Sequence, residues 1–173
     1  MLSSSTNSKH GLRPSSITEI VPFVELLPSI ERAHAATRLV IPATGCQLGA
    51  SLLTLDLDRQ GVQAEYVRGY YSGSPEQEHW WVDVEGLLLD PTRDQFSEDP
   101  FAEHYAGAYE RLDAKPASKM EHEATLLLRL HWSSNRRARD AIAQVAARYG
   151  LDLEEIMEPQ GLFVPVRATP DGA

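Results

Sequence analysis

Residues 79–92 read HWWVDVEGLLLDPT, and this stretch decides how the rest of the chain is interpreted. Glu85-Gly86 is a tight-turn signal between two runs rich in aliphatic and aromatic side chains, which predicts a β-hairpin. The strands of a hairpin are antiparallel, so the start of one lies beside the end of the other. We therefore expect His79 and Asp90 at the same end of a sheet.

Residues 62–70, VQAEYVRGY, precede the hairpin and alternate between polar and apolar side chains, which predicts a further strand. The polar segment SGSPEQE, residues 72–78, joins this strand to the hairpin. Its Gly and Pro predict a connecting loop, and its place beside His79 would also suit a mobile lid. With hairpin strands over 79–84 and 87–90, the sequence predicts three consecutive strands.

A helix precedes these strands. We expect it to begin at or just before Cys46, with Thr44 as its N-cap. Upstream, residues 17–40 carry apolar side chains at helical spacing. Pro28 interrupts this pattern, so we expect one helix or two, and Ser29 can cap the second.

The chain turns helical again after the hairpin, with Gly150 as a stop signal near its end. The segments expected here are a short helix or irregular stretch over 101–112, helices over 121–131 and 134–149, a helical turn over 151–157 and an edge strand from Pro159.

The order of these elements is that of an α+β fold and not of a βαβ fold. We expect a small antiparallel sheet packed on the Cys46 helix, with accessory helices at both ends. The 173 residues suit one domain over 17–173, after a flexible leader over 1–16. Its core would cover about 40–96 and a C-terminal helical portion about 100–158.

The chain is acidic, with 16 Lys and Arg against 25 Asp and Glu and a formal net charge of −9. This charge disfavours nucleic acid and anionic membranes as partners, and no run of about 18 apolar residues offers a membrane span. A single cysteine forms no internal disulfide and suits a reducing compartment, so we expect a cytoplasmic location. The oligomeric state stays open.

Three residues from separate segments form a pattern that can attack an amide. Cys46 stands at a helix N-terminus, where unpaired N–H groups and the helix dipole favour a thiolate. His79 can pair with the thiolate and later protonate the departing amine, while Asp90 orients the imidazole. The backbone N–H of Cys46 is a candidate oxyanion donor. A lone cysteine is more often a small buried hydrophobe, so the catalytic interpretation depends on the other two residues.

GCQLGASLL, residues 45–53, and HWWVDVEGLLLDPTRDQF, residues 79–96, resemble the core of the transglutaminase-like branch of the papain-like cysteine hydrolases. That branch has a cysteine at the head of a helix, a histidine at the head of a strand, and an aspartate, often as Asp-Pro-Thr, at the end of the next strand. The matching residues here are Cys46, His79 and Asp90. The DPTRDQF ending is also similar to that of the leader-peptide proteases of lasso-peptide biosynthesis.

The resemblance implies a cysteine-dependent amide hydrolase that cleaves a peptide or protein substrate without a cofactor. Glutamine deamidation and acyl transfer to an amine use the same acyl-enzyme, so both stay open. A non-catalytic binding domain of the same fold is a third alternative. The sequence pattern of residues 142–156, with Gly150 at the turn, is similar to that of a DNA-binding helix–turn–helix, but the segment carries too little positive charge for that role. No pair of histidines has metal-ligand spacing, so we expect no metal site.

Four further residues are candidates for contact with substrate. Trp80 and Trp81 point to opposite sides of their strand, so we expect one in the core and the other on a cleft wall. Gln47 could offer a side-chain donor, although a polar helix surface explains it equally well. Gln95 could donate to an oxyanion, hold the turn after Asp90 or be a solvated turn residue.

Overall fold

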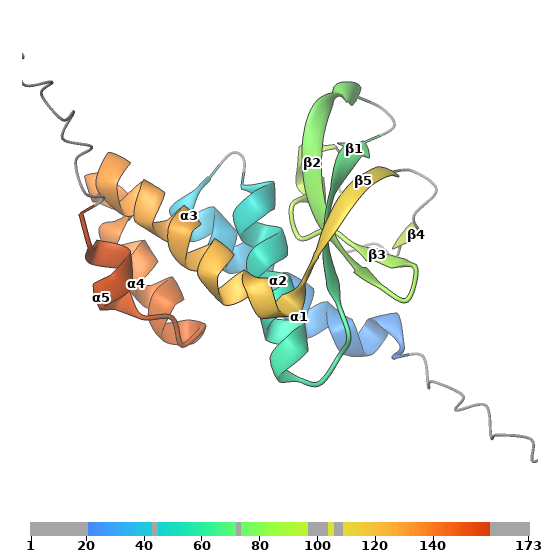
Figure 1. The fold of residues 1–173 in the computed structure, drawn as a ribbon, viewed down its shortest axis with the longest axis horizontal. Helices are drawn as coiled ribbons and strands as arrows, with labels where there is room; N and C mark the ends of the chain where they lie inside the picture. The colour runs from blue at the N-terminus through green and yellow to red at the C-terminus, as the bar shows by residue number, and fades with distance from the viewer. Residues whose placement is uncertain (1–20, 43–44, 72–73, 97–103, 106–108, 160–173) are drawn as a thin grey trace, which may run out of the picture.

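A computed structural model describes residues 21–42, 45–71, 74–96, 104–105 and 109–159 (Figure 1). Within them the fold is α+β, as predicted. The predicted leader over 1–16 and the tail beyond Pro159 lie outside the described residues. In chain order the elements are α1 Phe23–Val40, α2 Cys46–Arg59, β1 Glu65–Tyr71, β2 Ser74–Val84, β3 Leu87–Leu89, the 3₁₀ turn η1 Arg93–Gln95, β4 His104–Tyr105, β5 Tyr109–Pro116, the 3₁₀ turn η3 Ala117–Lys119, α3 Met120–Ser134, the 3₁₀ turn η4 Arg136–Ala138, α4 Arg139–Arg148 and α5 Leu153–Met157.

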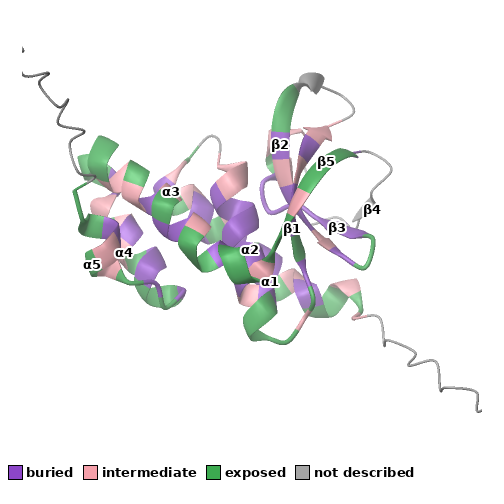
Figure 2. Cartoon of the chain, in the orientation of Figure 1, coloured by how far each residue is buried: buried purple, intermediate pink, exposed green. Residues whose placement is uncertain are grey.

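The sheet has five strands in the order β4-β3-β2-β1-β5, and the described pairings are antiparallel. The helices gather beside it: α2 lies against β1 and β2, while α1 and α3 pack on α2 (Figure 1). Helix α2 is buried over most of its length (Figure 2). It is therefore the central element that joins the sheet to the helices.

The predicted hairpin is confirmed. Val84 pairs with Leu87 across a two-residue turn, and both turn residues have positive φ, 53° at Glu85 and 88° at Gly86. This geometry matches the twist of the flanking strands, and glycine adopts it at little cost. The Asp83 carboxylate accepts a hydrogen bond of 2.8 Å from the Gly86 N–H and closes the turn.

The sheet buries side chains on both faces, because strand residues alternate between the two sides. One face packs on α2 and its neighbours and belongs to the main core, which is mostly hydrocarbon. The other face carries a smaller second cluster. The sheet contributes Tyr66, Val82, Val84, Leu87 and Leu89 to the main core, and the second cluster consists of Val67, Trp81, Leu88 and Tyr109.

Gly69 makes the second cluster possible. A Cβ at this position would lie 1.9 Å from the Glu110 carbonyl oxygen and 2.6 Å from the Trp81 ring. No side chain fits there, so the indole of Trp81 lies across β1 at the place where β5 approaches most closely. The result is a fully covered tryptophan, only 2% exposed.

Of the one or two helices expected over 17–40, the structure has one, because α1 runs through Pro28 without a break. Pro28 is exposed, so water can satisfy the carbonyl left without a helical partner. Ser29 is not a cap: it is 1% exposed in mid-helix and accepts hydrogen bonds from Arg32 (2.9 Å) and Gln60 (2.8 Å). Packing against α2 thus overrides the local signal.

Two expectations about strands are also wrong. Strand β2 already begins at Ser74, so most of the expected loop over 72–78 is strand. Strand β5 occupies the end of the segment expected as a short helix or irregular stretch over 101–112. Of the residues in β5 only Tyr109 is buried, so the alternation that marks a strand is missing. The C-terminal helical portion consequently begins at Ala117 and not near residue 100.

The expected C-terminal helices are present as α3, α4 and α5. Gly150 has a φ of 57° and follows α4, as its stop signal predicts. Helix α4 is preceded by η4, whose N-cap is Asn135. In the part of the chain that the structure describes, no helix is long and apolar enough to cross a membrane.

Candidate active site

Cys46 is the first residue of α2, as predicted. The N-cap is Gly45 and not Thr44, and the cap has no side-chain hydrogen bond. The first helical bond runs from the Gly49 N–H to the Gly45 carbonyl (2.8 Å). The N–H groups of the first turn therefore precede the helical ladder and are oriented toward the helix end. The Cys46 side chain is partly exposed, so a reagent or substrate can reach it.

His79 and Asp90 meet as the hairpin predicts. The Nε2–H of His79 donates a hydrogen bond of 2.6 Å to Oδ2 of Asp90, and both side chains are almost completely buried. Val82 pairs with Leu89 in an antiparallel register, so Trp81, which precedes Val82, is level with Asp90, which follows Leu89. His79 lies two residues further on the same face, which is the diagonal neighbour position across a strand pair.

Asp90 has donors on both of its oxygens. The backbone N–H and the hydroxyl of Thr92 donate to Oδ1 at 2.9 and 3.1 Å. The Tyr109 hydroxyl donates to Oδ2 at 3.1 Å, alongside His79. Arg93 in turn donates to the Tyr109 oxygen at 2.9 Å. A buried carboxylate needs this many partners, because an unsatisfied charge away from water is costly.

The surroundings of His79 favour the imidazolium form. Burial alone lowers the pKa of His79, but hydrogen bonds to Asp90 and Cys46, together with their charges, raise it from 6.5 to about 9. The ring is therefore a cation at neutral pH. Because Nε2 is bonded to Asp90, Nδ1 is the nitrogen left for Cys46. The Phe96 ring meets the imidazole edge-to-face at 4.8 Å and shields this pair.

Helix α2 reaches the Asp90 turn by close backbone packing at Gly49. A Cβ there would lie 3.1 Å from both Pro91 and Thr92. Cys46 is one helical turn before Gly49 and shares its face, so the sulfur is directed to the same end of the sheet. From α1, Nδ1 of His34 donates to the Pro91 carbonyl at 2.7 Å, since a carbonyl oxygen can only accept. Both contacts fix Asp90 relative to Cys46.

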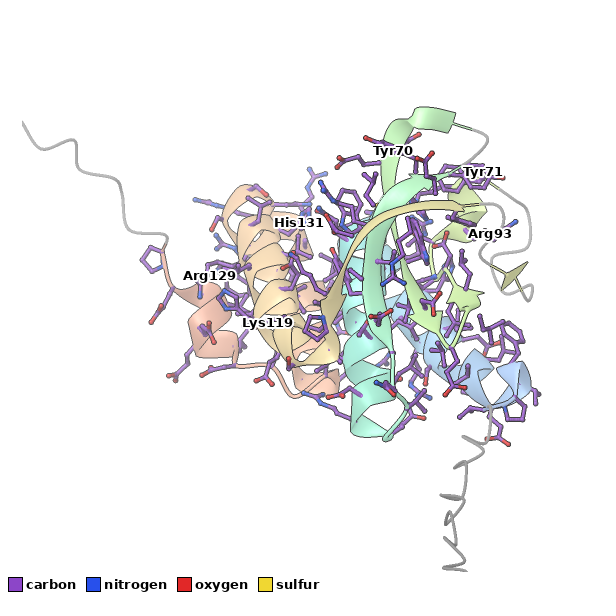
Figure 3. The ribbon with its side chains drawn as sticks, turned by 45° about the vertical axis from the view of Figure 1, so that its right-hand side comes forward. Tyr70, Tyr71, Arg93, Lys119, Arg129 and His131 are labelled. Atoms are coloured by element: carbon purple, nitrogen blue, oxygen red, sulfur yellow. The ribbon has the colours of Figure 1, made fainter. Side chains whose placement is uncertain are left out.

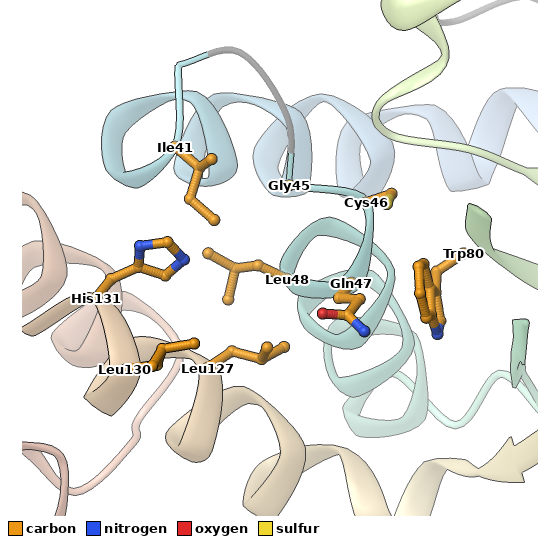
Figure 4. Close-up of a pocket in the computed structure, with 9 residues that line it drawn as sticks. All are labelled: Ile41, Gly45, Cys46, Gln47, Leu48, Trp80, Leu127, Leu130 and His131. Carbon is orange, nitrogen blue, oxygen red and sulfur yellow. The ribbon is translucent and has the colours of Figure 1, made fainter. Parts of the chain in front are cut away.

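A pocket of about 240 Å³ opens beside the cysteine, between the head of α2 and helix α3. Gln47 and Trp80 lie side by side at one end, and His131 lies at the other (Figure 4). Burial lowers the pKa of His131, which favours its neutral form. The lining is otherwise mostly apolar: Ile41, Gly45, Cys46, Leu48, Leu127 and Leu130.

Of the four expected substrate contacts, two line this pocket and two do not. Gln47 and Trp80 border it with Cys46. Trp81 is the tryptophan in the core, where it belongs to the second cluster and is closed to substrate. Gln95 donates to the Thr92 carbonyl at 3.1 Å, so its amide holds the turn after Asp90.

Sequence reasoning missed Tyr109, Arg93 and His34 as supports of the site. Arg93 and Tyr71 lie at the same end of the sheet (Figure 3), where the Tyr71 ring meets the Tyr109 ring at 5.2 Å. Tyr109 is far from Asp90 in the sequence and stands in an unrecognised strand, so no local signal could have joined them. His34 lies within a segment with an apolar helical pattern, and nothing in that pattern indicates its contact with Pro91.

Comparison with known proteins adds no relative. The chain matches no protein-family model, and neither a curated protein nor a solved structure was found to be similar to it.

Proposed function

We propose that this chain is a cysteine-dependent amide hydrolase with a transglutaminase-like fold, which cleaves a peptide bond in a peptide or protein. One observation carries the proposal: the imidazole of His79 bonds Asp90 through Nε2, and Cys46 is among the groups that raise the pKa of this ring. This is the order of groups that a thiolate nucleophile, its acid–base partner and an orienting carboxylate require.

In the first half-reaction the Cys46 thiolate attacks the amide carbonyl carbon, and a C–S bond forms. The oxyanion is stabilised by N–H groups of the first turn of α2. His79 enters as imidazolium and donates its proton to the amine nitrogen as the C–N bond breaks. The products of this step are a thioester on Cys46, a free amine and a neutral imidazole.

In the second half-reaction a water molecule attacks the thioester. His79 accepts the proton of the water as the C–O bond forms, and the C–S bond then breaks to release the carboxylic acid and the thiolate. Asp90 remains an anion throughout and holds the ring in one orientation. Because the thiolate must stay reduced, a cytoplasmic location is part of the proposal.

The direct test is the reactivity of Cys46, the single cysteine of the chain, so intact mass reports its alkylation alone. An ordinary thiol with a pKa of about 8.5 reacts with iodoacetamide roughly 50- to 100-fold more slowly at pH 6 than at pH 8. We expect less than a tenfold difference here. His79→Gln should restore the ordinary dependence, while His131→Gln should not, because His131 lines the pocket at Cys46 but has no bond to Asp90.

Turnover is then measured with a library of internally quenched peptides. Cys46→Ala should abolish every cleavage that the wild-type chain performs. Cleavage that persists in this variant would end the proposal, as would ordinary alkylation of the wild type at pH 6. Ammonia release from glutamine, or amide formation with an added amine, in place of peptide cleavage would assign the acyl-enzyme to deamidation or transfer.

A further inference from the structure

Two tyrosines near the site are both buried, and their hydroxyls differ. The Tyr109 oxygen has two partners, Asp90 and Arg93. The Tyr66 hydroxyl has none, although the side chain is only 1% exposed. An unpaired buried hydroxyl destabilises the folded chain, so an unpaired polar group beside a candidate active site requires an explanation.

Tyr66 lines a second pocket, of about 260 Å³, which we call the Tyr66 pocket. Its other lining residues are Gln47, Arg68, Trp80, Asp113, Lys115 and Glu123. Gln47 and Trp80 also border the apolar pocket at Cys46, so these two side chains separate the pockets. A substrate seated on Cys46 can therefore extend past Trp80 into the Tyr66 pocket.

The charges around the Tyr66 pocket are already paired. Arg68 bonds Asp113 at 2.6 Å and Glu78 at 3.3 Å, and Lys115 bonds Glu123 at 2.9 Å. A charged side chain entering the pocket would have to compete with these pairs. A neutral group with a hydrogen-bond acceptor would not, and it would satisfy the orphan hydroxyl. Burial, together with the negative charges of Glu123 and Cys46, raises the pKa of Tyr66, so the hydroxyl stays protonated and can donate.

We infer that the Tyr66 pocket is a second substrate subsite that binds a neutral amide side chain, Gln or Asn, whose carbonyl oxygen accepts a hydrogen bond from the Tyr66 hydroxyl. An apolar side chain of the same peptide occupies the pocket at Cys46. This inference rests on the proposed function and names the substrate class: a peptide with an apolar residue and an amide residue on either side of Trp80.

The test measures how well peptides protect Cys46 from iodoacetamide. The probes are N-acetyl tetrapeptide amides with one leucine and, at each other position in turn, Gln, Glu or norleucine. Gln and Glu have nearly the same shape and differ in charge, whereas norleucine lacks the acceptor. We expect at least one Gln peptide to protect at a concentration about five- to tenfold lower than its Glu and norleucine counterparts, the effect of one neutral hydrogen bond.

Tyr66→Phe removes the hydroxyl alone and should reduce the advantage of Gln over norleucine to less than twofold, while free Cys46 alkylates at the wild-type rate. Tyr149→Phe is the matched control, because Tyr149 is also buried with an unpaired hydroxyl but lines neither pocket. It should preserve the preference for Gln.

Two outcomes would overturn the subsite: a wild-type chain that protects no better with Gln than with norleucine, or a Gln preference that survives Tyr66→Phe. Slower alkylation of free Cys46 in Tyr66→Phe would also overturn it, because the hydroxyl would then act on the thiolate and not on a substrate. Ordinary alkylation of the wild type at pH 6 would instead count against the proposed function, so the two failures are distinguishable.

Discussion

The two faces of the sheet bury side chains by different physical means. On the face toward α2, the main core is built of hydrocarbon side chains that exclude water. When one of them is shortened, its neighbours can repack around it. On the opposite face, a carboxylate and an imidazole are buried beside the aromatic second cluster. Their burial depends on hydrogen bonds, and each of these bonds requires a particular distance and angle between donor and acceptor. The comparison teaches that the hydrocarbon of the first face sets stability, whereas the second face holds the acid–base pair of the candidate site.

The second face is sensitive to substitution because the buried polar groups around Asp90 are hydrogen-bonded to one another. Removal of one donor leaves a buried charge with fewer partners, and the penalty falls on the group that remains. We therefore expect substitutions around Asp90 to lower both reactivity and stability, and substitutions in the main core to lower stability while the reactivity of the folded molecules is unchanged. Three measurements can break or sharpen this contrast, and the largest effect comes first.

Asp90→Asn should lower kcat/KM by roughly 10³-fold or more. The two donors of Thr92 fix the amide oxygen of the substituted side chain at the Oδ1 position, so its NH₂ group must face His79. The ring nitrogen Nε2 then accepts in place of donating. In the neutral ring the proton moves to Nδ1, beside Cys46, and no base faces the thiol. Steady-state cleavage of a library-selected peptide and alkylation at pH 6 should both show the loss.

Leu53→Ala is the matched control on the other face, because Leu53 is fully buried in the main core on the same helix as Cys46. It should lower the free energy of unfolding by about 2–5 kcal/mol, yet leave kcat/KM per folded molecule unchanged. Urea unfolding measures the first quantity. If Asp90→Asn retained activity within tenfold of the wild type, or Leu53→Ala abolished it in folded protein, the division between the faces would be wrong.

The second measurement is the pH dependence of stability. The pKa of His79 rises from 6.5 to about 9 on folding, so the folded chain keeps a proton that the unfolded chain loses in that window. The stabilisation is fully present below pH 6.5 and is lost as pH rises through about 9. The free energy of unfolding should fall with pH, with a slope of at most about 1.4 kcal/mol per unit from this proton.

Urea unfolding of a Cys46→Ser variant at intervals from pH 6 to 9.5 measures this slope, because in the wild type the proposed thiolate would take up a proton on unfolding and offset the proton that His79 loses. The range ends before the tyrosines of the unfolded chain titrate near pH 10. Asp90→Asn should flatten the curve, because the anion that holds the proton is gone. Activity should decline above about pH 9 as well, since the imidazolium donates a proton to the leaving amine. A stability of Cys46→Ser that is constant or rises from pH 7 to 9 would contradict the ion pair of His79 with Asp90.

The two faces also differ in how far the sequence predicts them. The hairpin follows from local signals, the turn at Glu85-Gly86 and the apolar runs beside it, and it brings His79 to Asp90. The start of α2 at Cys46 is local too. These signals were sufficient to predict that His79 lies near Asp90, that Cys46 heads a helix, and that the fold is α+β.

The supporting groups could not be predicted, because each depends on a tertiary contact. Strand β5 buries only Tyr109, so its sequence has no alternation, and the bond from Tyr109 to Asp90 joins distant segments. Proline generally breaks a helix, but Pro28 is on the exposed side of α1. Ser29, the next residue, packs on α2. Trp81 and not Trp80 is buried because its ring occupies the space beside Gly69. That space exists only once the strands of the sheet have assembled.

The smallest effect is expected for Tyr109→Phe, which tests whether every donor on the second face matters equally. The change removes the 3.1 Å bond to Asp90 and the acceptor of Arg93, but keeps the ring packed against Trp81 at 5.0 Å. Stability should fall by about 1–2 kcal/mol. With one donor fewer, the carboxylate attracts the His79 proton at least as strongly, so kcat/KM should fall less than tenfold and its decline near pH 9 should not move to lower pH. A loss as large as that of Asp90→Asn would mean that the tyrosine hydroxyl takes part in the reaction, and that the site is a tetrad and not a triad with a structural support.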